Sequence, residues 1–211
     1  MADFEIERDI CRKGGRTIAG IDEVGRGALF GPVLAAAVVL PESMILGPAP
    51  SWLAEVNDSK TLSPRKRRLL AQFILAEAEA VGVGLASHAE IDEKNIYRAS
   101  LEAMTRAVRN LPLAPGYLLI DGPRIRLGAF EIPQVSIPRG DRTSKSIAAA
   151  SIVAKVLRDE MMMIFDDIYK GYQLCKNKGY GTREHYRALK EKGPTTLHRL
   201  TFNLRSETRN P

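Results

Sequence analysis

Two neighbouring acids, Asp22 and Glu23, stand immediately before a glycine-flanked arginine formed by Gly25, Arg26 and Gly27. Uncompensated carboxylates this close together repel each other, and a bound divalent cation is the usual way to offset that repulsion. Because successive side chains of a strand point to opposite faces, both acids can serve one site only at a strand end, where the backbone begins to turn. The glycines that follow can supply that turn.

A third acid, Asp121, repeats this layout. It ends the apolar run Tyr117 to Ile120 and is followed by Gly122 and Pro123, which is typical of a strand that ends in a turn. An acid before glycine is most often only a turn residue. Asp121 gains weight as a site residue because its surroundings resemble those of the first acidic pair.

The composition indicates a globular protein with a surplus of positive charge. The chain has 211 residues, of which 45% are hydrophobic and 27% charged, with a formal net charge of +6. That charge favours an anionic partner, with nucleic acid ahead of a membrane surface. Cys11 and Cys175 have no metal-ligand spacing, and no signal or membrane-spanning segment is visible, so a reducing, cytoplasmic location is expected.

The elements that would position these residues alternate between strands and helices. Apolar runs between turn signals predict strands at 17–21, 33–40, 81–87, 117–120 and 134–138. Helical spacing and caps predict helices at 64–80, 91–110, 146–157 and 183–192, with a short helix from about Thr195 or Thr196. The methionines at 161–163 are interpreted as packing residues. This alternation predicts an α/β domain with a helical appendage at its C-terminus.

Five short motifs in this sequence occur in the order found in the ribonuclease HII family, the type 2 ribonucleases H. They are GIDEVGRG, NDSK, LIDG, RGD followed by SIAAASIVAKVLRD, and KGYGT, and the resemblance extends from about Ile18 to Phe202. Each motif alone is weak, but the ordered set is specific. The resemblance implies a ribonuclease H-like α/β fold, a five-stranded mixed sheet flanked by helices. It divides the chain into a leader at 1–17, a catalytic domain at 18–170 and a helical substrate-binding extension at 171–211.

The resemblance also implies a set of site residues. The metal-binding catalytic acids of the family match Asp22, Glu23, Asp121 and Asp141. The residues that read the junction between a ribonucleotide and the next deoxynucleotide match Gly25, Arg26, Gly27 and Tyr180. Positions near the nucleic-acid backbone match Asn57, Ser59, Lys60, Ser144 and Lys145. Asp159 is expected to have a supporting role, paired with Lys155 across one helical turn.

The activity implied by the resemblance is that of an endonuclease for RNA–DNA hybrids and for DNA duplexes with embedded ribonucleotides. It would cut 5′ of the ribonucleotide by two-metal-ion catalysis and leave 3′-hydroxyl and 5′-phosphate ends, in DNA replication and repair. Oxygen ligands suit Mg²⁺ or Mn²⁺ as the cofactor, and no cysteine or histidine cluster indicates zinc. A monomer is expected, and recruitment of a sliding clamp by the tail from Glu207 is left open.

Three positions depart from the family pattern, namely Ala28, Phe30 and Asn177. None of them removes a carboxylate, so the chemistry is expected to persist, while the fit of the junction-reading loop is less defined. The histidines at 88, 185 and 198 are expected to be structural or close to the substrate.

Three other functions can be compared with the sequence, beginning with a dinucleotide-binding site at the glycine-rich turn. A dinucleotide-binding turn must open a helix, whereas Pro32 and a strand-like run follow here, which excludes it. Two alternatives stay open: a hybrid-binding protein without catalysis, and another metal-dependent nuclease of the same fold, such as a junction resolvase.

Overall fold

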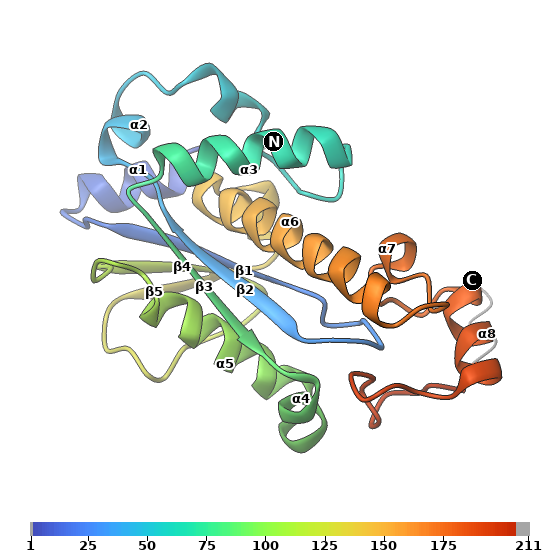
Figure 1. Ribbon diagram of the computed structural model, residues 1–211. Helices are drawn as coiled ribbons and strands as arrows, with labels where there is room; N and C mark the ends of the chain where they lie inside the picture. The colour runs from blue at the N-terminus through green and yellow to red at the C-terminus, as the bar shows by residue number, and fades with distance from the viewer. Residues whose placement is uncertain (1, 206–211) are drawn as a thin grey trace.

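The computed structural model describes residues 2–205, which form a five-stranded mixed sheet flanked by helices, with a helical extension at one end (Figure 1). The strand order is β3-β2-β1-β4-β5. The strands are β1 (Ile18–Val24), β2 (Val33–Val39), β3 (Ala80–Ala86), β4 (Tyr117–Asp121) and β5 (Gln134–Ile137). β1, β2 and β3 pair antiparallel, whereas β4 is parallel to both β1 and β5. The predicted fold class is confirmed.

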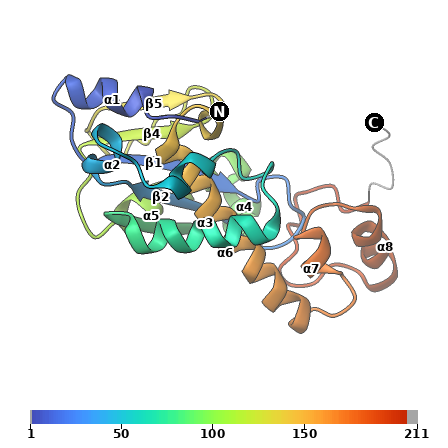
Figure 2. The ribbon, with the colours of Figure 1, turned by 90° about the horizontal axis from the view of Figure 1, so that it is seen from above.

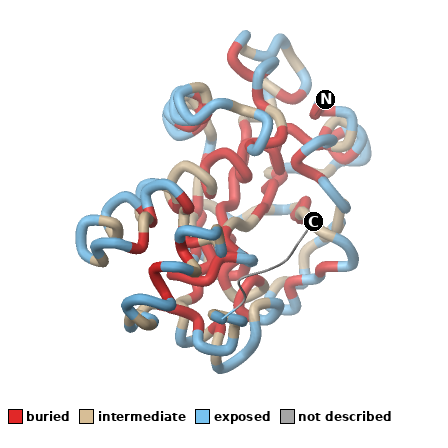
Figure 3. The backbone as a smooth tube through the Cα atoms, turned by 90° about the vertical axis from the view of Figure 1, so that its right-hand side faces the viewer, coloured by how far each residue is buried: buried red, intermediate tan, exposed pale blue. Residues whose placement is uncertain are grey.

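Helices cover both faces of this sheet. α6 packs on β1 and β2 with α3 beside it, and α5 packs on the opposite face against β2 and β3 (Figure 1). The helices are α1 (Glu5–Arg12), α2 (Glu42–Leu46), α3 (Pro64–Glu77), α4 (His88–Lys94), α5 (Ile96–Arg109), α6 (Lys145–Ile168), α7 (Leu174–Asn177) and α8 (Arg183–Lys192), with 3-10 turns η1 (Ser51–Glu55) and η2 (Gly140–Arg142). Each face has its own apolar core, and the buried backbone is concentrated between the layers (Figure 3).

Glycines in the sheet allow the helices to approach it closely. A Cβ added at Gly20 of β1 would lie 2.1 Å from the Ser146 carbonyl carbon at the start of α6. The alternating glycines of β3, Gly82 and Gly84, would meet the Ala107 and Ala103 carbonyl oxygens of α5 at 2.1 and 2.2 Å. These glycines therefore set how near α6 and α5 lie to the strands.

The N-terminal leader is an integral part of this packing. α1 buries Glu7, whose Oε1 accepts hydrogen bonds from the Ser144 hydroxyl at 2.7 Å and from the Ser146 amide at 2.9 Å. A carboxylate at the first turn of a helix satisfies free amides and complements the helix dipole. The leader thus fixes the N-terminus of α6.

Three predicted elements differ in the structure. The helix expected over 146–157 continues as α6 to Ile168. The helix expected over 91–110 is two helices, because Asn95 adopts a φ of 73° and its side chain caps α5 through the Arg98 amide. The short helix expected from Thr195 or Thr196 is absent. That segment is instead tied to the loop before β2, where the Gly31 amide donates to Leu197 and the Arg199 amide to Leu29.

The C-terminal extension stands beyond one end of the sheet and packs on the last turns of α6 (Figure 2). Its small apolar core includes Phe30, Met162, Tyr172 and Leu174. Of the predicted packing methionines, Met162 is fully buried while Met163 is 43% exposed. Within residues 2–205 no helix is long and apolar enough to cross a membrane. The tail from Glu207, where clamp recruitment was left open, lies outside the described residues.

Candidate active site

The ends of two parallel strands bring three of the predicted acids together. β1 pairs with β4 up to Ile21 opposite Ile120, so Asp22 and Asp121 occupy the next positions at the same edge of the sheet. Their carboxyl groups are hydrogen-bonding neighbours. Glu23 lies beyond the end of the β4 pairing, where it is close enough to Asp121 for their charges to interact. Asp22 and Glu23 lie within β1, which pairs with β2 as far as Val24, so the strand end expected at the acidic pair is found only on the β4 side, where the pairing stops at Ile21.

The fourth acid, Asp141, reaches this edge through the turn after β5. The Asp121 Oδ1 accepts the Gly140 amide at 2.6 Å, and Asp121 also accepts the Asp141 amide. These bonds hold η2 against the end of β4. Asp141 is 5% exposed, and its carboxylate is in electrostatic contact with Asp121. All the predicted metal-binding acids thus lie along one edge of the sheet.

Burial and mutual repulsion make these acids reluctant to ionise. Burial, then Glu23 and Asp121, raise the pKa of Asp22 well above its usual value. Burial and the Asp121 charge raise the pKa of Glu23, although Arg26 opposes the shift from 3.1 Å. Burial also raises the pKa of Asp121 and of Asp141. Such clusters of raised carboxyl pKa values are typical of functional sites.

The donor set fits hard divalent cations. Glu23 Oε2 is buried and has no hydrogen-bond partner, so it is a free oxygen ligand in a cluster that needs positive charge. Within the described residues no group of three or more acidic, histidine or cysteine side chains converges tightly enough to hold an ion alone. Mg²⁺ in phosphate-processing sites is commonly held by one or two carboxylates together with substrate oxygens. The arrangement therefore fits ions that are completed by a nucleic-acid phosphate.

The glycine-flanked arginine and Tyr180 lie next to each other. Gly25 has a φ of 92°, and a Cβ there would meet the Arg158 guanidinium, so the turn requires glycine. Ala28 pairs with Tyr180 as an isolated bridge, and the Tyr180 ring is the nearest group to the open face of Gly27. The turn and the tyrosine form one surface beside the acidic edge.

Two buried arginines that sequence reasoning missed hold this surface in place. Arg158 donates to the carbonyls of Phe30, Pro32 and Lys178 at 3.1, 3.2 and 2.8 Å. Arg199 donates to the carbonyl of Arg26, in the turn itself, at 2.9 Å. Both arginines are fully buried. Arg158 lies in the motif SIAAASIVAKVLRD, but no local signal shows what either arginine binds, because their partners are distant in the chain.

Comparison with known proteins agrees with this geometry. The ribonuclease HII family model matches residues 19–205. The chain belongs to the ribonuclease HII family. Relatives named ribonuclease HII include that of Moorella thermoacetica, 49% identical over 93% of this chain and 91% of its own length. That of Geotalea uraniireducens is 50% identical over 94% of this chain and 88% of its own.

Solved structures of ribonucleases H share the fold. Ribonuclease H2 from Pyrococcus horikoshii OT3 aligns with a TM-score of 0.74 and 25% identity, covering 89% of this chain and 94% of that one. The ribonuclease HII of a PCNA:RNase HII complex from Archaeoglobus fulgidus aligns with a TM-score of 0.70 and 25% identity, covering 91% and 98%. The chain is therefore a ribonuclease H, an endonuclease of RNA–DNA hybrids from a divalent-metal-dependent family.

The residues that match backbone-contacting positions of the ribonuclease HII family have different surroundings. Lys60 is exposed, with its Nζ 4.0 Å from Asp141 Oδ2. Asn57 is half-buried and accepts the Ala2 amide. Ser144 is buried against Glu7, and the Lys145 ammonium donates to the carbonyls of Leu53 and Val56 at 2.7 and 2.8 Å.

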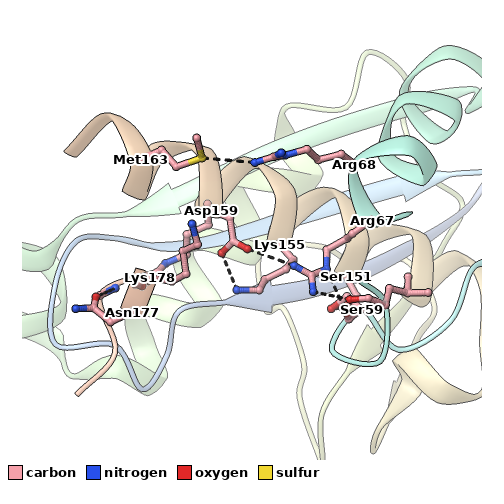
Figure 4. Close-up of polar contacts among 12 residues, drawn as sticks. Ser59, Arg67, Arg68, Ser151, Lys155, Asp159, Met163, Asn177 and Lys178 are labelled. Atoms are coloured by element: carbon pink, nitrogen blue, oxygen red, sulfur yellow. Dashed lines mark hydrogen bonds and ion pairs between the residues drawn. The ribbon is translucent and has the colours of Figure 1, made fainter. Parts of the chain in front are cut away.

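Ser59 connects this segment to the acids. Its hydroxyl is buried and lies 3.0 Å from the Ser151 hydroxyl of α6, and Ser151 in turn hydrogen-bonds Asp22 (Figure 4). The free groups of the predicted backbone-contacting set are thus Lys60 and part of Asn57, while the serines and Lys145 are engaged within the protein.

Asp58, which sequence reasoning passed over, organises the cations around Asp141. Its Oδ2 lies 3.0 Å from Arg142 Nη2, and its Oδ1 accepts the Lys60 amide at 3.0 Å. Asp58 is 3% exposed, whereas Lys60 and Arg142 are exposed. A buried acid therefore binds the main chain of Lys60 and the guanidinium of Arg142, two exposed cations near Asp141.

The predicted pair of Asp159 and Lys155 is confirmed at 2.6 Å. Asp159 also lies 3.3 Å from Arg67, whose guanidinium donates to the carbonyls of Ser59 and Leu62 (Figure 4). Asp159 therefore links α6 to the loop that carries Lys60, and it stands apart from the acids of the site. Arg67 belongs to the basic run at 65–68, and its contacts hold the loop at 59–62 against α6.

The three departures from the family pattern are all buried around the extension. Phe30 packs edge-on against Phe165 and His198, with ring centroids 5.7 and 5.0 Å apart. Asn177 accepts the Gly179 amide and donates to the Tyr172 carbonyl, which shapes the turn before Tyr180. These residues pack between the glycine-flanked turn and the extension, and none of them belongs to the acidic edge.

Proposed function

We propose that this protein hydrolyses the RNA strand of RNA–DNA hybrids and also cuts 5′ of single ribonucleotides embedded in duplex DNA. The products would be 3′-hydroxyl and 5′-phosphate ends. The observation that carries the proposal is the alignment of Asp22, Glu23, Asp121 and Asp141 along one sheet edge, beside the glycine-flanked turn and Tyr180. Roles in ribonucleotide removal and primer processing follow from that substrate choice.

In this proposal the acids hold two divalent cations, Mg²⁺ or Mn²⁺. When bound, such ions supply an activated water and stabilise negative charge on a leaving oxygen. Asp22 and Asp121, as neighbours on adjacent strands, would share ligand duties, with Glu23 and Asp141 on either side. The raised pKa values of these acids, caused by burial and mutual repulsion, support the need for bound positive charge.

Selection of the ribonucleotide would depend on the turn at 25–27. The 2′-hydroxyl is the group that distinguishes RNA from DNA. Backbone amides can approach a sugar closely where the residues lack side chains, as at Gly25 and Gly27. The ring of Tyr180 would lie against the following deoxyribose, where a 2′-hydroxyl would clash. Arg26 and Lys60 are exposed cations at the rim, placed to hold phosphates.

The decisive experiment compares three labelled duplexes: DNA with one ribonucleotide, an RNA–DNA hybrid, and plain DNA. Each is incubated with Mg²⁺, Mn²⁺ or a chelator, and the ends of the products are mapped. Cleavage of the first two, 5′ of the ribonucleotide and only with metal, supports the proposal. Equal cutting of plain DNA, or preference for a four-way junction, would favour a resolvase-type nuclease.

Asp121→Asn separates catalysis from binding. We expect cleavage to fall by about a thousandfold or more while hybrid binding persists, because the amide removes a charged ligand and keeps the shape. A variant that binds hybrid and retains full activity would show that the acids do not carry the reaction.

A sliding clamp is the protein partner that we propose, because the Archaeoglobus fulgidus relative was solved in complex with PCNA. The test is binding of the full chain, and of a chain ending at residue 205, to a sliding clamp by surface plasmon resonance. Binding by the full chain alone would assign the interaction to the last residues. No binding by either chain would remove the clamp from the proposal.

A further inference from the structure

Two buried histidines link the loop at 195–199 to Tyr180. His185 lies on α8, and His198 lies within the loop at 195–199. The two side chains are 0% and 1% exposed. Their Nε2 atoms are 3.1 Å apart. His198 Nδ1 lies 2.9 Å from the Thr195 amide, and His185 Nδ1 lies 2.9 Å from the Tyr180 carbonyl.

The backbone groups at the two ends determine which nitrogen of each ring carries a proton. The Thr195 amide can only donate, so His198 Nδ1 accepts and the proton of a neutral ring lies on Nε2. The Tyr180 carbonyl can only accept, so His185 Nδ1 carries its proton and Nε2 is free to accept from His198. The chain of hydrogen bonds therefore runs in one direction, from Thr195 to Tyr180.

The Thr195 hydroxyl also lies 2.9 Å from His198 Nδ1, and the rings packed against His198 are aromatic. Tyr172 and Phe30 pack against His198 with ring centroids 5.1 and 5.0 Å away, and the neighbouring Arg199 adds positive charge. Burial lowers the pKa of both histidines, that of His198 to about 4. The pair is neutral at ordinary pH, which is the state that the one-directional chain requires.

The same pair reaches the segment that carries the glycine-flanked turn. Phe30 and His198 form an isolated backbone bridge, and Ala28 forms one with Tyr180. His198 forms one of these bridges, and His185 hydrogen-bonds Tyr180, which forms the other. The histidine pair therefore connects the two bridges that follow the glycine-flanked turn. Among residues 2–205, His185 reaches the surface formed by the turn and Tyr180 through the hydrogen bond from its Nδ1 to the Tyr180 carbonyl.

We propose that His185 and His198 are positioning residues for cleavage at the ribonucleotide–deoxynucleotide junction, because their hydrogen-bond chain fixes the main chain of Tyr180 against the turn. This inference rests on the proposed function, in which Tyr180 reads the deoxyribose after the ribonucleotide. Neither histidine touches the acids or a phosphate in this arrangement. Their effect is expected on substrate selection rather than on the chemical step.

Two substitutions at one position separate this role from simple packing. In His185→Asn the amide nitrogen takes the place of Nδ1 and can still donate to Tyr180, whereas in His185→Gln it takes the place of Nε2 and cannot. The readout is kcat/KM on DNA with one ribonucleotide divided by kcat/KM on a uniform RNA–DNA hybrid. We expect His185→Gln to lower this ratio about three- to tenfold, the worth of one hydrogen bond, and His185→Asn to keep it within about twofold.

Tyr180→Ala, measured alongside, distinguishes failure of this inference from failure of the proposed function. If Tyr180→Ala lowers the ratio and His185→Gln does not, the histidine role is wrong and the junction role of Tyr180 stands. If Tyr180→Ala leaves the ratio unchanged, both are wrong. Equal losses on both substrates in both His185 variants would show a packing role only.

A measurement on the unaltered protein keeps the inference testable if the variants fold poorly. Long-range ¹H–¹⁵N correlation spectra of the imidazoles report which ring nitrogen is protonated. We expect the proton on Nε2 of His198 and on Nδ1 of His185 at neutral pH. The opposite tautomers, or a charged ring, would overturn the proposal.

Discussion

The position of Asp22 lowers the folding stability of the metal-free protein. It is 6% exposed, its carboxyl adjoins those of Glu23 and Asp121, and only the Ser151 hydroxyl and the Glu23 amide oppose its raised pKa. An acid whose pKa is higher in the folded than in the unfolded state favours folding less as pH rises, because the folded state holds its proton longer. Ionised Asp22 is therefore a local cost that a bound cation would remove.

Asp22→Asn should stabilise the metal-free protein while abolishing cleavage. We expect the free energy of unfolding in a chelator at pH 8 to rise by about 1–2 kcal/mol, as is common when a strained functional group is neutralised. The gain should shrink at pH 5, where the wild-type carboxyl is closer to protonation. Urea unfolding at both pH values measures it.

The matched control for this prediction is Asp9→Asn, on an exposed face of α1 where Asp9 only pairs with Lys13. It should change stability by less than about 0.5 kcal/mol, as surface substitutions usually do. Added Mg²⁺ should stabilise the wild type and the control but not Asp22→Asn. A destabilised Asp22→Asn at pH 8 would contradict the electrostatic account.

His198 predicts a separate loss of stability in acid. Its pKa is lowered by burial and by His185 from 6.5 to about 4. Between these two pH values the unfolded chain binds the proton more readily than the folded protein. The stability that the neutral His198 contributes is therefore complete above about pH 6.5 and is lost as pH falls toward 4. Thermal unfolding of wild type and His198→Asn across this range should show a smaller pH dependence in the variant. An identical dependence would mean that His198 titrates normally.

The site residues differ in how visible they are in the sequence. Asp121 ends β4 before a turn, and Asp22 and Glu23 are the third-last and second-last residues of β1, so local pattern and motif both mark them. Asp58 and Arg158 also lie in quoted motifs, NDSK and SIAAASIVAKVLRD, but the motifs do not show which groups these two residues bind. Arg158 lies in the apolar helix pattern of α6, and its role depends on carbonyls more than a hundred residues away in the chain. Long-range partners of a buried charge cannot be inferred from a local pattern.

At the scale of elements, the site depends on how closely α6 lies on β1. Gly20 is two residues before Asp22, and its missing Cβ makes room for the Ser146 main chain at the start of α6. The same start of the helix is capped by Ser144 and by Glu7 from α1. Ser151, nearly two turns further along, then reaches Asp22. A displacement of α6 would therefore move the hydrogen-bond partner of Asp22.

Gly20→Ala should be destabilising and should also slow cleavage. A Cβ 2.1 Å from backbone atoms cannot be accommodated by a side-chain rotation, so we expect a loss of about 1–3 kcal/mol or more. Gly128→Ala is the matched control, because no atom lies within 4 Å of its added Cβ. Denaturant unfolding and cleavage of hybrid by both variants test this. Equal stability of the two variants would refute the close approach.

The elements that the sequence predicted correctly carry their own local signals. Ser63 and Pro64 mark the start of α3, Gly193 follows the end of α8, and the strands are apolar runs between turns. The start of α4 before residue 91 also had a signal, the capping box of Ser87 and Glu90. The segment after Pro194 had none, because its conformation is set by hydrogen bonds to the loop before β2.

At the scale of the whole molecule, the extension projects past the end of the sheet and carries Tyr180 to the glycine-flanked turn (Figure 2). Exposed cations lie near the acids on the other side, with Lys60 and Arg142 anchored by Asp58. The acidic edge is thus bordered by cations and by the extension. A polyanion can approach it despite the negative charge of the acids, and the net charge of +6 favours that approach.

Salt dependence of binding tests this arrangement. Each phosphate neutralised by a cation releases counterions, so the logarithm of the binding constant falls with the logarithm of salt concentration by about 0.9 per contact on a duplex. We expect a steep fall for hybrid binding to Asp121→Asn, which prevents cleavage during the measurement. Adding Lys60→Ala should weaken binding and reduce the slope by about one contact, because Lys60 is exposed beside Asp141. Lys13→Ala should change neither, because Lys13 caps the end of α1, pairs with Asp9 and lies near the residues that precede β1, at the opposite end of that strand from Asp22. Equal effects of the two lysines would mean that binding follows net charge alone rather than the cations placed around the acidic edge.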